Sequence, residues 1–185
     1  MADGLETPAN KIATAQAVLS LTFRLSSEVN SGRIGAELFT HEVTVFTGGT
    51  GLLLRASPER TLADLKAGME NLNVLALSAS ALTVDETLDE VFGKLVNDKD
   101  ANRVAIRVMV NQLRNAFAHN PWRAKWLIYP KYRNLYPIVL DDGSKFMFDA
   151  TNLDGQGVMP QQVGGVEFWV KVLQHCKRLV SRARV

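Results

Sequence analysis

The sequence predicts a mostly α-helical fold, an up-and-down bundle of helices with a small β-hairpin inserted before the last helix. Apolar residues recur at helical spacing in several segments, as expected for helices with one buried face. Residues that cap helices stand in front of most of these segments. Between residues 126 and 148 the pattern changes to β-branched and aromatic residues around a turn, which indicates paired strands.

Length and composition define the class of protein. The chain has 185 residues, 46% of them apolar, which fits one globular domain over residues 1–185. A single cysteine excludes a disulfide framework, and three scattered histidines lack zinc-site spacing, so we expect no metal and no cofactor. The chain begins without signal-peptide features and has no membrane-spanning apolar run, so we expect a cytoplasmic protein with no membrane partner.

The first helix is expected over residues 9–29. Thr7 fits an N-cap and Pro8 fits the first helical position, where a missing N–H costs nothing. The following segment, residues 33–55, stays open. Its first half fits a short helix, whereas Thr44–Thr47 fit an extended strand.

Two helices are expected between residues 57 and 95. Ser57 and Pro58 repeat the cap-and-proline signal, and apolar residues at helical spacing continue to about residue 81. Thr83 and Glu86 fit a capping box, in which each side chain bonds the backbone N–H of the other residue. This box predicts the start of a separate, shorter helix.

The next helix is expected over residues 101–119. Asp100 can cap its start, and Asn120 followed by Pro121 ends it, because proline cannot continue a helix. Extended segments, a turn, a glycine-rich loop and a last helix come after it. The extended segments are 126–129, 136–140 and 145–148, the turn is 141–144, the loop is 154–165, and the last helix has its apolar face over 166–180.

The helix over residues 101–119 has two faces of different chemistry. At about 100° per residue, seven apolar residues fall within one sector and form the predicted core face. They are Ala105, Ile106, Met109, Val110, Leu113, Ala116 and Phe117. The opposite half mixes polar residues with valine. Because a face that meets only water rarely carries two valines at its centre, we infer a contact with another subunit through Val104, Val108 and Asn111.

The end of this helix resembles a known motif. Arg114-Asn115-Ala116-Phe117-Ala118-His119 is similar to the signature of the HEPN superfamily, in which an Arg followed by a polar residue stands a few residues before a His. The hairpin, the glycine-containing loop and the closing helix resemble a subset of small stand-alone members. The resemblance covers about residues 101–180, and the first half of the chain matches only as helices of suitable length.

The resemblance implies a HEPN-like helical bundle and a metal-independent endoribonuclease, a homodimer whose two subunits bring Arg and His residues into one cleft. Such cleavage needs a base for the 2′-hydroxyl proton and a cation for the charge that develops at phosphorus. His119 and Arg114 have side chains suited to these roles, and Asn115 would orient the His or the phosphate. The alternative is a non-catalytic module that binds RNA or a protein partner such as an antitoxin, in a toxin or antiviral system.

Positive charge collects in the second half of the chain. Residues 1–100 carry a net charge of −6 and residues 101–185 a net charge of +8. Basic residues after the motif are interleaved with aromatic rings, a mixture suited to phosphate attraction and base stacking on single-stranded RNA. The expected RNA contacts are Arg123, Lys125, Arg107 and Arg103.

Other groups of residues have simpler interpretations. The acidic run Asp85, Glu86, Asp89 and Glu90 has helical metal-site spacing but no histidine, so we interpret it as a solvated helix start. The glycine-rich residues 47–51 lack the Lys-Ser/Thr of a phosphate-binding loop. Cys176 lies on an apolar stripe and is expected in the core.

Overall fold

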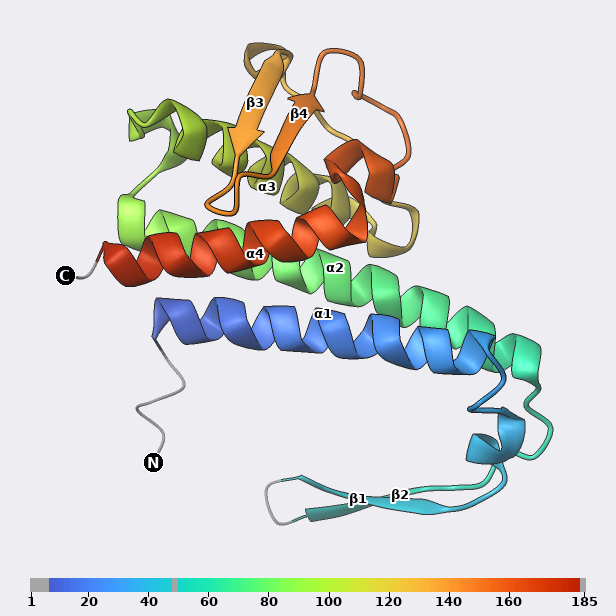
Figure 1. Cartoon of the computed structure of the whole chain (residues 1–185). Coiled ribbons are helices and arrows are strands. Elements are labelled where there is room, and N and C mark those ends of the chain that lie inside the picture. The colour runs from blue at the N-terminus through green and yellow to red at the C-terminus, as the bar shows by residue number, and fades with distance from the viewer. Residues whose placement is uncertain (1–6, 48–49, 184–185) are drawn as a thin grey trace. The chain divides into compact units, whose positions relative to one another are not determined.

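The computed structural model describes residues 7–47 and 50–183. The protein is mostly helical, at 62%, with four α-helices and two antiparallel strand pairs in the described residues, which confirms the prediction of a mostly α-helical fold with a small β-hairpin (Figure 1). The helices are α1 (Pro8–Asn30), α2 (Leu62–Phe92), α3 (Ala101–His119) and α4 (Gly165–Arg182). The strands are β1 (Val43–Thr47), β2 (Thr50–Leu54), β3 (Leu135–Val139) and β4 (Lys145–Asp149).

The chain divides into two compact units, one formed by residues 1–20 and 74–185 and the other by residues 21–73. The smaller unit answers the question that the sequence left open between residues 33 and 55. A short 3-10 helix, Ala36–Phe39, precedes β1, and β1 pairs antiparallel with β2. The apolar side chains of this pair are exposed; Phe46, for example, is 76% accessible.

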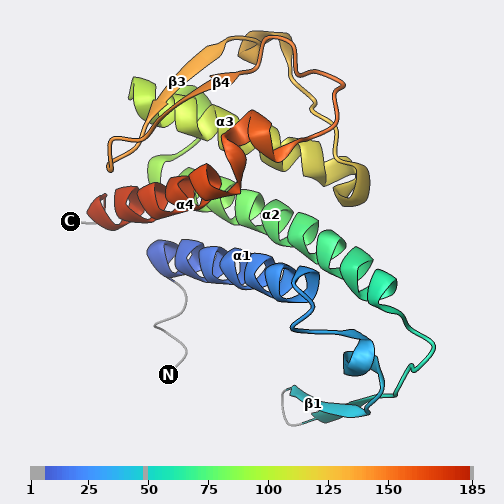
Figure 2. The same cartoon turned by 45° about the vertical axis from the view of Figure 1, so that its right-hand side comes forward.

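The larger unit contains the core and the predicted motif. In both views α4 runs alongside α2, and the β3–β4 pair lies over α3 (Figures 1 and 2). The indole N–H of Trp169 on α4 donates to the hydroxyl of Ser80 on α2 at 2.9 Å, inside the core. All seven residues predicted on the core face of α3 are buried. Burial of one such aliphatic side chain contributes about 1.5–3 kcal/mol, so this face fixes α3 in the unit.

Helix α2 begins later than the sequence predicted. The predicted start at Ser57 and Pro58 is wrong, because Ser57 forms a turn instead, with its N–H bonded to the Phe39 carbonyl at 2.7 Å. Thr61 and Asp64 cap the helix reciprocally. The Thr61 N–H donates to the Asp64 carboxylate at 2.8 Å, and the Asp64 N–H donates to the Thr61 hydroxyl at 3.3 Å. A hydroxyl residue caps the helix, as predicted, but it is Thr61, four residues after the predicted Ser57.

Helix α2 also continues through residues 83–86, so the predicted separate helix is wrong. Thr83 does not cap a helix start, because its hydroxyl donates back to the Ala79 carbonyl at 2.8 Å. Val84 and Leu88 are buried and continue the core face of the same helix without interruption. Tertiary packing of this face outweighs a local capping signal worth about 1 kcal/mol.

The ends of α3 agree with the prediction. The carboxylate of Asp100 accepts a hydrogen bond from the Arg103 N–H at 2.8 Å and caps the first turn. After His119, the Asn120 side chain accepts from the N–H groups of Trp122 and Arg123, both at 3.1 Å, and begins a short 3-10 turn with Pro121. The motif therefore lies in the last turn and a half of a well-capped helix.

The predicted hairpin before the last helix is present, but it has only two of the three expected extended segments. β3 and β4 pair with Ile138 opposite Phe146, and Ile138 and Phe148 are fully buried. Residues 126–129 form no strand. Trp126 is instead buried with its indole N–H bonded to the Gln162 side chain at 2.8 Å.

The last helix lies where the sequence predicted it, after the glycine-rich loop. Gly164 precedes it with φ of +85°, and a Cβ there would lie 2.7 Å from the ring of Phe168, so glycine is required twice over. Cys176 is fully buried on its apolar face, and burial raises the pKa of the thiol to about 12. The cysteine is core, as expected.

Candidate functional site

The motif residues lie on different flanks of the C-terminal half of α3. Arg114 retains 39% of its side-chain exposure, Asn115 is half-buried, and His119 is exposed. Arg114 and His119 are five positions apart in the sequence, which places them about 140° apart around the helix and ~7.5 Å apart along it. Within one chain the two side chains therefore leave α3 in diverging directions.

A chain of hydrogen bonds holds Arg114 in place. Its Nη1 donates to the side-chain oxygen of Asn115 at 3.0 Å, and the Asn115 amide donates to the Asn111 oxygen at 3.2 Å. Asn111 in turn donates to both carboxylate oxygens of Asp85 on α2, at 3.2 Å each. Arg114 Nε also lies 3.9 Å from Asp85. Because Asn111 and Asn115 are four residues apart, they meet on one face of the helix.

Asp85 is the one member of this network that comes from another helix. Burial raises the pKa of its carboxyl; the Asn111 hydrogen bond opposes that rise, and the nearby Asp89 adds to it. Asp85 thus accepts hydrogen bonds from the neutral amide of Asn111, and its nearest guanidinium nitrogen, on Arg114, lies 3.9 Å away. The sequence interpretation of Asp85 as part of a solvated helix start is corrected here, because its side chain is only 17% exposed.

His119 shares a basic hollow with residues that follow it. The hollow has a volume of about 520 Å³, and Arg123 and Lys125 line it together with His119 and Asp154. Arg123 and Lys125 are both exposed. The structure therefore brings together three of the predicted functional residues: one imidazole, one guanidinium and one ammonium, which are groups that can hold a phosphate and exchange protons with its neighbours.

A second hollow lies on the other flank of α3 and has a volume of about 510 Å³. Asn111 and Asn115 line it from the helix, and residues 129–132 line it from the segment that leads to β3. Tyr129 is 53% exposed, and the Lys131 ammonium lies 4.8 Å from the centre of the Tyr132 ring. This hollow presents amides beside aromatic rings.

Arg103 and Arg107 are not placed to contact RNA, in contrast to the sequence expectation. Arg107 is 2% exposed and forms ion pairs of 2.8 Å with Asp89 and with Asp98, whose own side chain is fully buried. Arg103 pairs with Asp98 at 2.7 Å, and its guanidinium lies 4.4 Å from the centre of the Phe92 ring. Acidic residues of the same chain pair with both arginines, so their guanidinium groups already have partners within the chain.

The valine face of α3 also has a different explanation from the one predicted. Val108 is 1% exposed within the single chain and Val104 is half-buried. A small hollow of about 280 Å³ beside these two valines is lined by other residues of the same chain: Leu95, Val96, Asp98, Lys131, Tyr132 and Tyr136. The Asn111 side chain donates hydrogen bonds to the Asp85 carboxylate. Val108 is therefore not available for a subunit contact, whereas a contact through Val104 stays a prediction.

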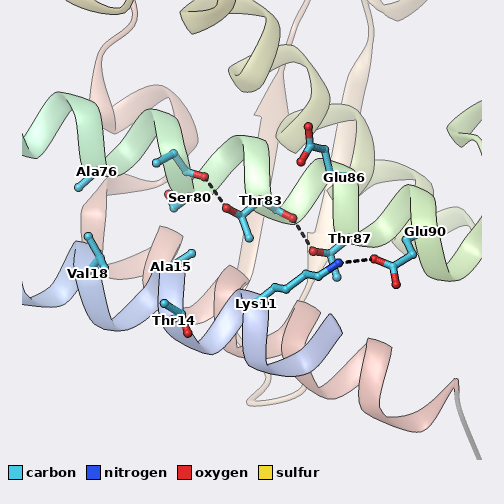
Figure 3. A pocket seen from close by; sticks show the side chains of 11 residues that line it. Lys11, Thr14, Ala15, Val18, Ala76, Ser80, Thr83, Glu86, Thr87 and Glu90 are labelled. Carbon is cyan, nitrogen blue, oxygen red and sulfur yellow. Dashed lines mark hydrogen bonds and ion pairs between the residues drawn. The ribbon is translucent and has the colours of Figure 1, made fainter. Parts of the chain in front are cut away.

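Another hollow, of about 580 Å³, lies between α1 and α2 and contains none of the predicted site residues (Figure 3). Of its charged residues, Lys11 and Glu90 form an ion pair at 2.9 Å. The hydroxyls of Thr83 and Thr87 donate to carbonyls of their own helix, at 2.8 and 2.6 Å. Lys11, Glu90, Thr83 and Thr87 are thus already bonded within the chain.

Two general properties of the described chain bear on its chemistry. Among residues 7–47 and 50–183, no three His, Cys, Asp or Glu side chains come together as ligands for a metal ion. None of the helices in that part of the chain combines the length and the apolar character needed to cross a bilayer.

Comparisons with protein-family models, curated proteins and solved structures find no match to this chain.

Sequence reasoning missed two acidic residues that organise the motif helix. Asp98 was not singled out, although it stands two residues before the cap Asp100, and Asp85 was assigned to solvent. The sequence contains a signal for Asp85. Asp85 and Asp89 are four residues apart and therefore share a helix face, which can pair with basic residues of another helix.

Proposed function

We propose that the protein is a metal-independent endoribonuclease of the HEPN type, with a composite site formed by Arg114 and His119 from two copies of the chain. The observation that carries the proposal is the basic hollow in which His119 lies beside Arg123 and Lys125, on the helix that also holds Arg114 in an amide network. These groups fit the polyanionic backbone of RNA and the proton transfers of its cleavage.

The proposed reaction uses imidazole and guanidinium groups alone. Neutral His119 takes the proton of the 2′-hydroxyl, and the 2′-oxygen attacks phosphorus. The bond to the 5′-oxygen breaks, and that oxygen leaves with a proton from the protonated His119 of the second copy. Arg114 holds the non-bridging oxygens through two parallel hydrogen bonds and stabilises their charge. The products are a 2′,3′-cyclic phosphate and a 5′-hydroxyl.

The divergence of Arg114 and His119 supports a site made from two chains. Side chains that leave one helix about 140° apart point away from each other and do not reach the same phosphate directly. Two copies related by a twofold axis would bring the Arg of one chain to face the His of the other. Because Val108 is buried, the exposed C-terminal end of α3 is the part of the helix that remains for such a contact.

The test is cleavage of RNA by the purified chain in excess EDTA, with the product ends identified by mass spectrometry. We expect cyclic-phosphate ends and a loss of about 100-fold or more in rate for His119→Ala. Arg114→Ala is expected to lose about 100-fold through the charge it no longer stabilises. The matched control is His41→Ala, which removes an exposed histidine of the smaller unit.

Each variant is purified by the same procedure, so a contaminating nuclease would cut equally in all samples. Circular dichroism checks that the variants stay folded. Cutting by His119→Ala at the rate of the unmodified chain, or dependence of cutting on added divalent metal, would refute the proposal.

A second candidate function is RNA binding without cleavage. It is favoured by the same divergence of Arg114 and His119, since a chain that stays monomeric keeps a basic hollow but has no converged Arg and His. This function predicts that RNA is retained without turnover. Charge reversal of Arg123 or Lys125 would then abolish retention, and His119→Ala would leave it unchanged.

A further inference from the structure

Apart from the amide network that holds Arg114, the hollow formed by Asn111, Asn115 and residues 129–132 has no role in the reaction just described. We propose that it is a nucleobase subsite and that adenine is the base it fits best. This inference rests on the proposed function, because it places the base next to the phosphate held by Arg114. It goes further in naming a specificity that the catalytic groups do not supply.

The orientation of the Asn111 amide follows from its partners. The carboxylate of Asp85 accepts, so the nitrogen of Asn111 faces it, with 3.2 Å to each oxygen. The oxygen of Asn111 then accepts from Gln112 at 3.1 Å and from Asn115 at 3.2 Å, which uses both of its lone pairs. The two Asp85 oxygens belong to one carboxylate and lie close together, so one N–H of Asn111 serves both and the other remains for a ligand in the hollow.

The Asn115 amide is fixed in the same way. Its nitrogen donates to Asn111, and its oxygen accepts from Arg114 at 3.0 Å. One N–H and one lone pair remain. Together the two amides offer two donors and one acceptor, and the adenine ring carries the complementary set: the N6 amino group between the acceptors N1 and N7. A side-chain amide of asparagine is a common partner of adenine for this reason.

The opposite wall of the hollow supplies surfaces for stacking. Tyr129 exposes 53% of its surface, and Tyr132 and Pro130 line the hollow beside it. Stacking on an aromatic ring is worth about 1–3 kcal/mol per base in single-stranded nucleic acids, and a purine covers more of the ring than a pyrimidine does. The volume of about 510 Å³ lies within the range of small-molecule sites.

Arg114 connects this hollow to the proposed chemistry. Its guanidinium bonds directly to the Asn115 amide, so in this proposal a nucleotide whose base meets Asn115 places its phosphate beside Arg114. Lys131, at the rim of the hollow, adds a cation for a neighbouring phosphate.

The experiment is an NMR titration of the ¹⁵N-labelled full chain with AMP, GMP, UMP and ribose 5-phosphate. The side-chain amide signals of Asn111 and Asn115 are assigned from Asn111→Ala and Asn115→Ala. We expect AMP to shift both signals and to bind about 10-fold more tightly than ribose 5-phosphate, with GMP and UMP weaker than AMP. Equal affinity for AMP and ribose 5-phosphate, or a stronger response to GMP or UMP, overturns the proposal.

Variants place the effect in the hollow. Tyr129→Ala and Asn111→Ala are each expected to weaken AMP about 10-fold, and the control Phe46→Ala, which removes an exposed ring of the smaller unit, is expected to leave it unchanged. Thermal unfolding shows whether each variant is folded, and Tyr129→Phe keeps the ring if Tyr129→Ala does not fold. AMP affinity that neither tyrosine nor asparagine variants reduce would refute the assignment.

The titration needs no cleavage, so the two proposals fail separately. A chain that does not cut RNA but shows the AMP response retains the subsite and loses the nuclease function. A chain that cuts RNA with no base preference and shows no AMP response retains the nuclease function and loses the subsite.

Discussion

Helix α3 meets a buried or half-buried carboxylate at each end, Asp98 near its start and Asp85 near its end. Asp98 is bonded by two guanidinium groups, at 2.7 Å from Arg103 and 2.8 Å from Arg107. Asp85 is bonded by an amide, and its nearest guanidinium nitrogen, on Arg114, lies 3.9 Å away. The first end is a closed ionic cluster, and the second leaves its arginine partly free.

The pKa values of the two carboxyls record this difference. Burial acts to raise the pKa of Asp98, but the hydrogen bonds from Arg103 and Arg107 outweigh it, and the pKa falls from 3.8 to about 2. Burial also raises the pKa of Asp85, and there the Asn111 hydrogen bond does not compensate. The comparison shows that carboxylates from other segments pair closely with Arg103 and Arg107, whereas Arg114 has no carboxylate nearer than 3.9 Å.

The largest effect is expected from Arg107→Ala, which removes the centre of the ionic cluster. The change leaves part of the charge on Asp98 and Asp89 uncompensated and also removes a bond to the Gly93 carbonyl. We expect a loss of about 3 kcal/mol in the free energy of unfolding, measured by urea denaturation. Arg114→Ala is the matched control, with an expected change of about 0.5 kcal/mol or less, because that pair is long and partly exposed.

Equal destabilisation by Arg107→Ala and Arg114→Ala would remove the distinction between the two ends of the helix. A large loss for Arg114→Ala alone would reverse it and would assign the motif arginine to structure.

The next effect is a pH dependence carried by Asp98. Because its pKa is lower in the folded chain than the usual 3.8, the ionised carboxylate stabilises the fold above pH 3.8. This contribution, about 2 kcal/mol, is lost as the pH falls through about 2. Asp98→Asn should therefore be less stable than the unmodified chain at pH 6 and equally stable near pH 2, as measured by urea denaturation at each pH. A difference that persists at pH 2 would contradict the assignment.

A smaller effect is expected from Arg103→Lys. Lysine keeps the charge opposite Asp98 but loses the second parallel hydrogen bond and the flat contact with the Phe92 ring at 4.4 Å. We expect a loss of about 1 kcal/mol in thermal or urea unfolding. No loss at all would indicate that the guanidinium geometry at this end of α3 is unimportant.

The sequence predicted much of this helix and little of its surroundings. Periodicity alone identified the seven core residues of α3, and local chemistry identified Asp100 and Asn120 as its caps. Both signals are local, because they depend on residues within a few positions of one another. Whether Arg107 is buried depends instead on Asp89 and Asp98, which reach it only after the chain has folded back.

The same limit explains the errors elsewhere. The predicted subunit contact through Val108 is wrong because Val108 is buried within the chain, and nothing in its own helix shows that residues such as Leu95 and Tyr136 fold back beside it. Thr83 and Glu86 have the residue types of a capping box, but no helix starts there, since the buried Val84 and Leu88 keep α2 continuous. The assignment of chemistry to Arg114 and His119 stays a prediction that depends on the RNA cleavage assay.

The smallest effect, and one of opposite sign, is expected from Asp85→Asn. Because burial raises the pKa of Asp85, its ionised form costs stability, and the cost appears as the pH rises through that raised pKa. Asparagine removes the charge and still accepts from Asn111. We therefore expect a gain of about 0.5 kcal/mol or less at pH 8 and no difference at pH 3, measured by urea denaturation. Glu86→Gln, at the exposed neighbouring position, should change stability at neither pH. A loss of stability with Asp85→Asn at pH 8 would mean that Arg114 compensates this carboxylate as fully as Arg107 compensates Asp98, and that the two ends of α3 are alike.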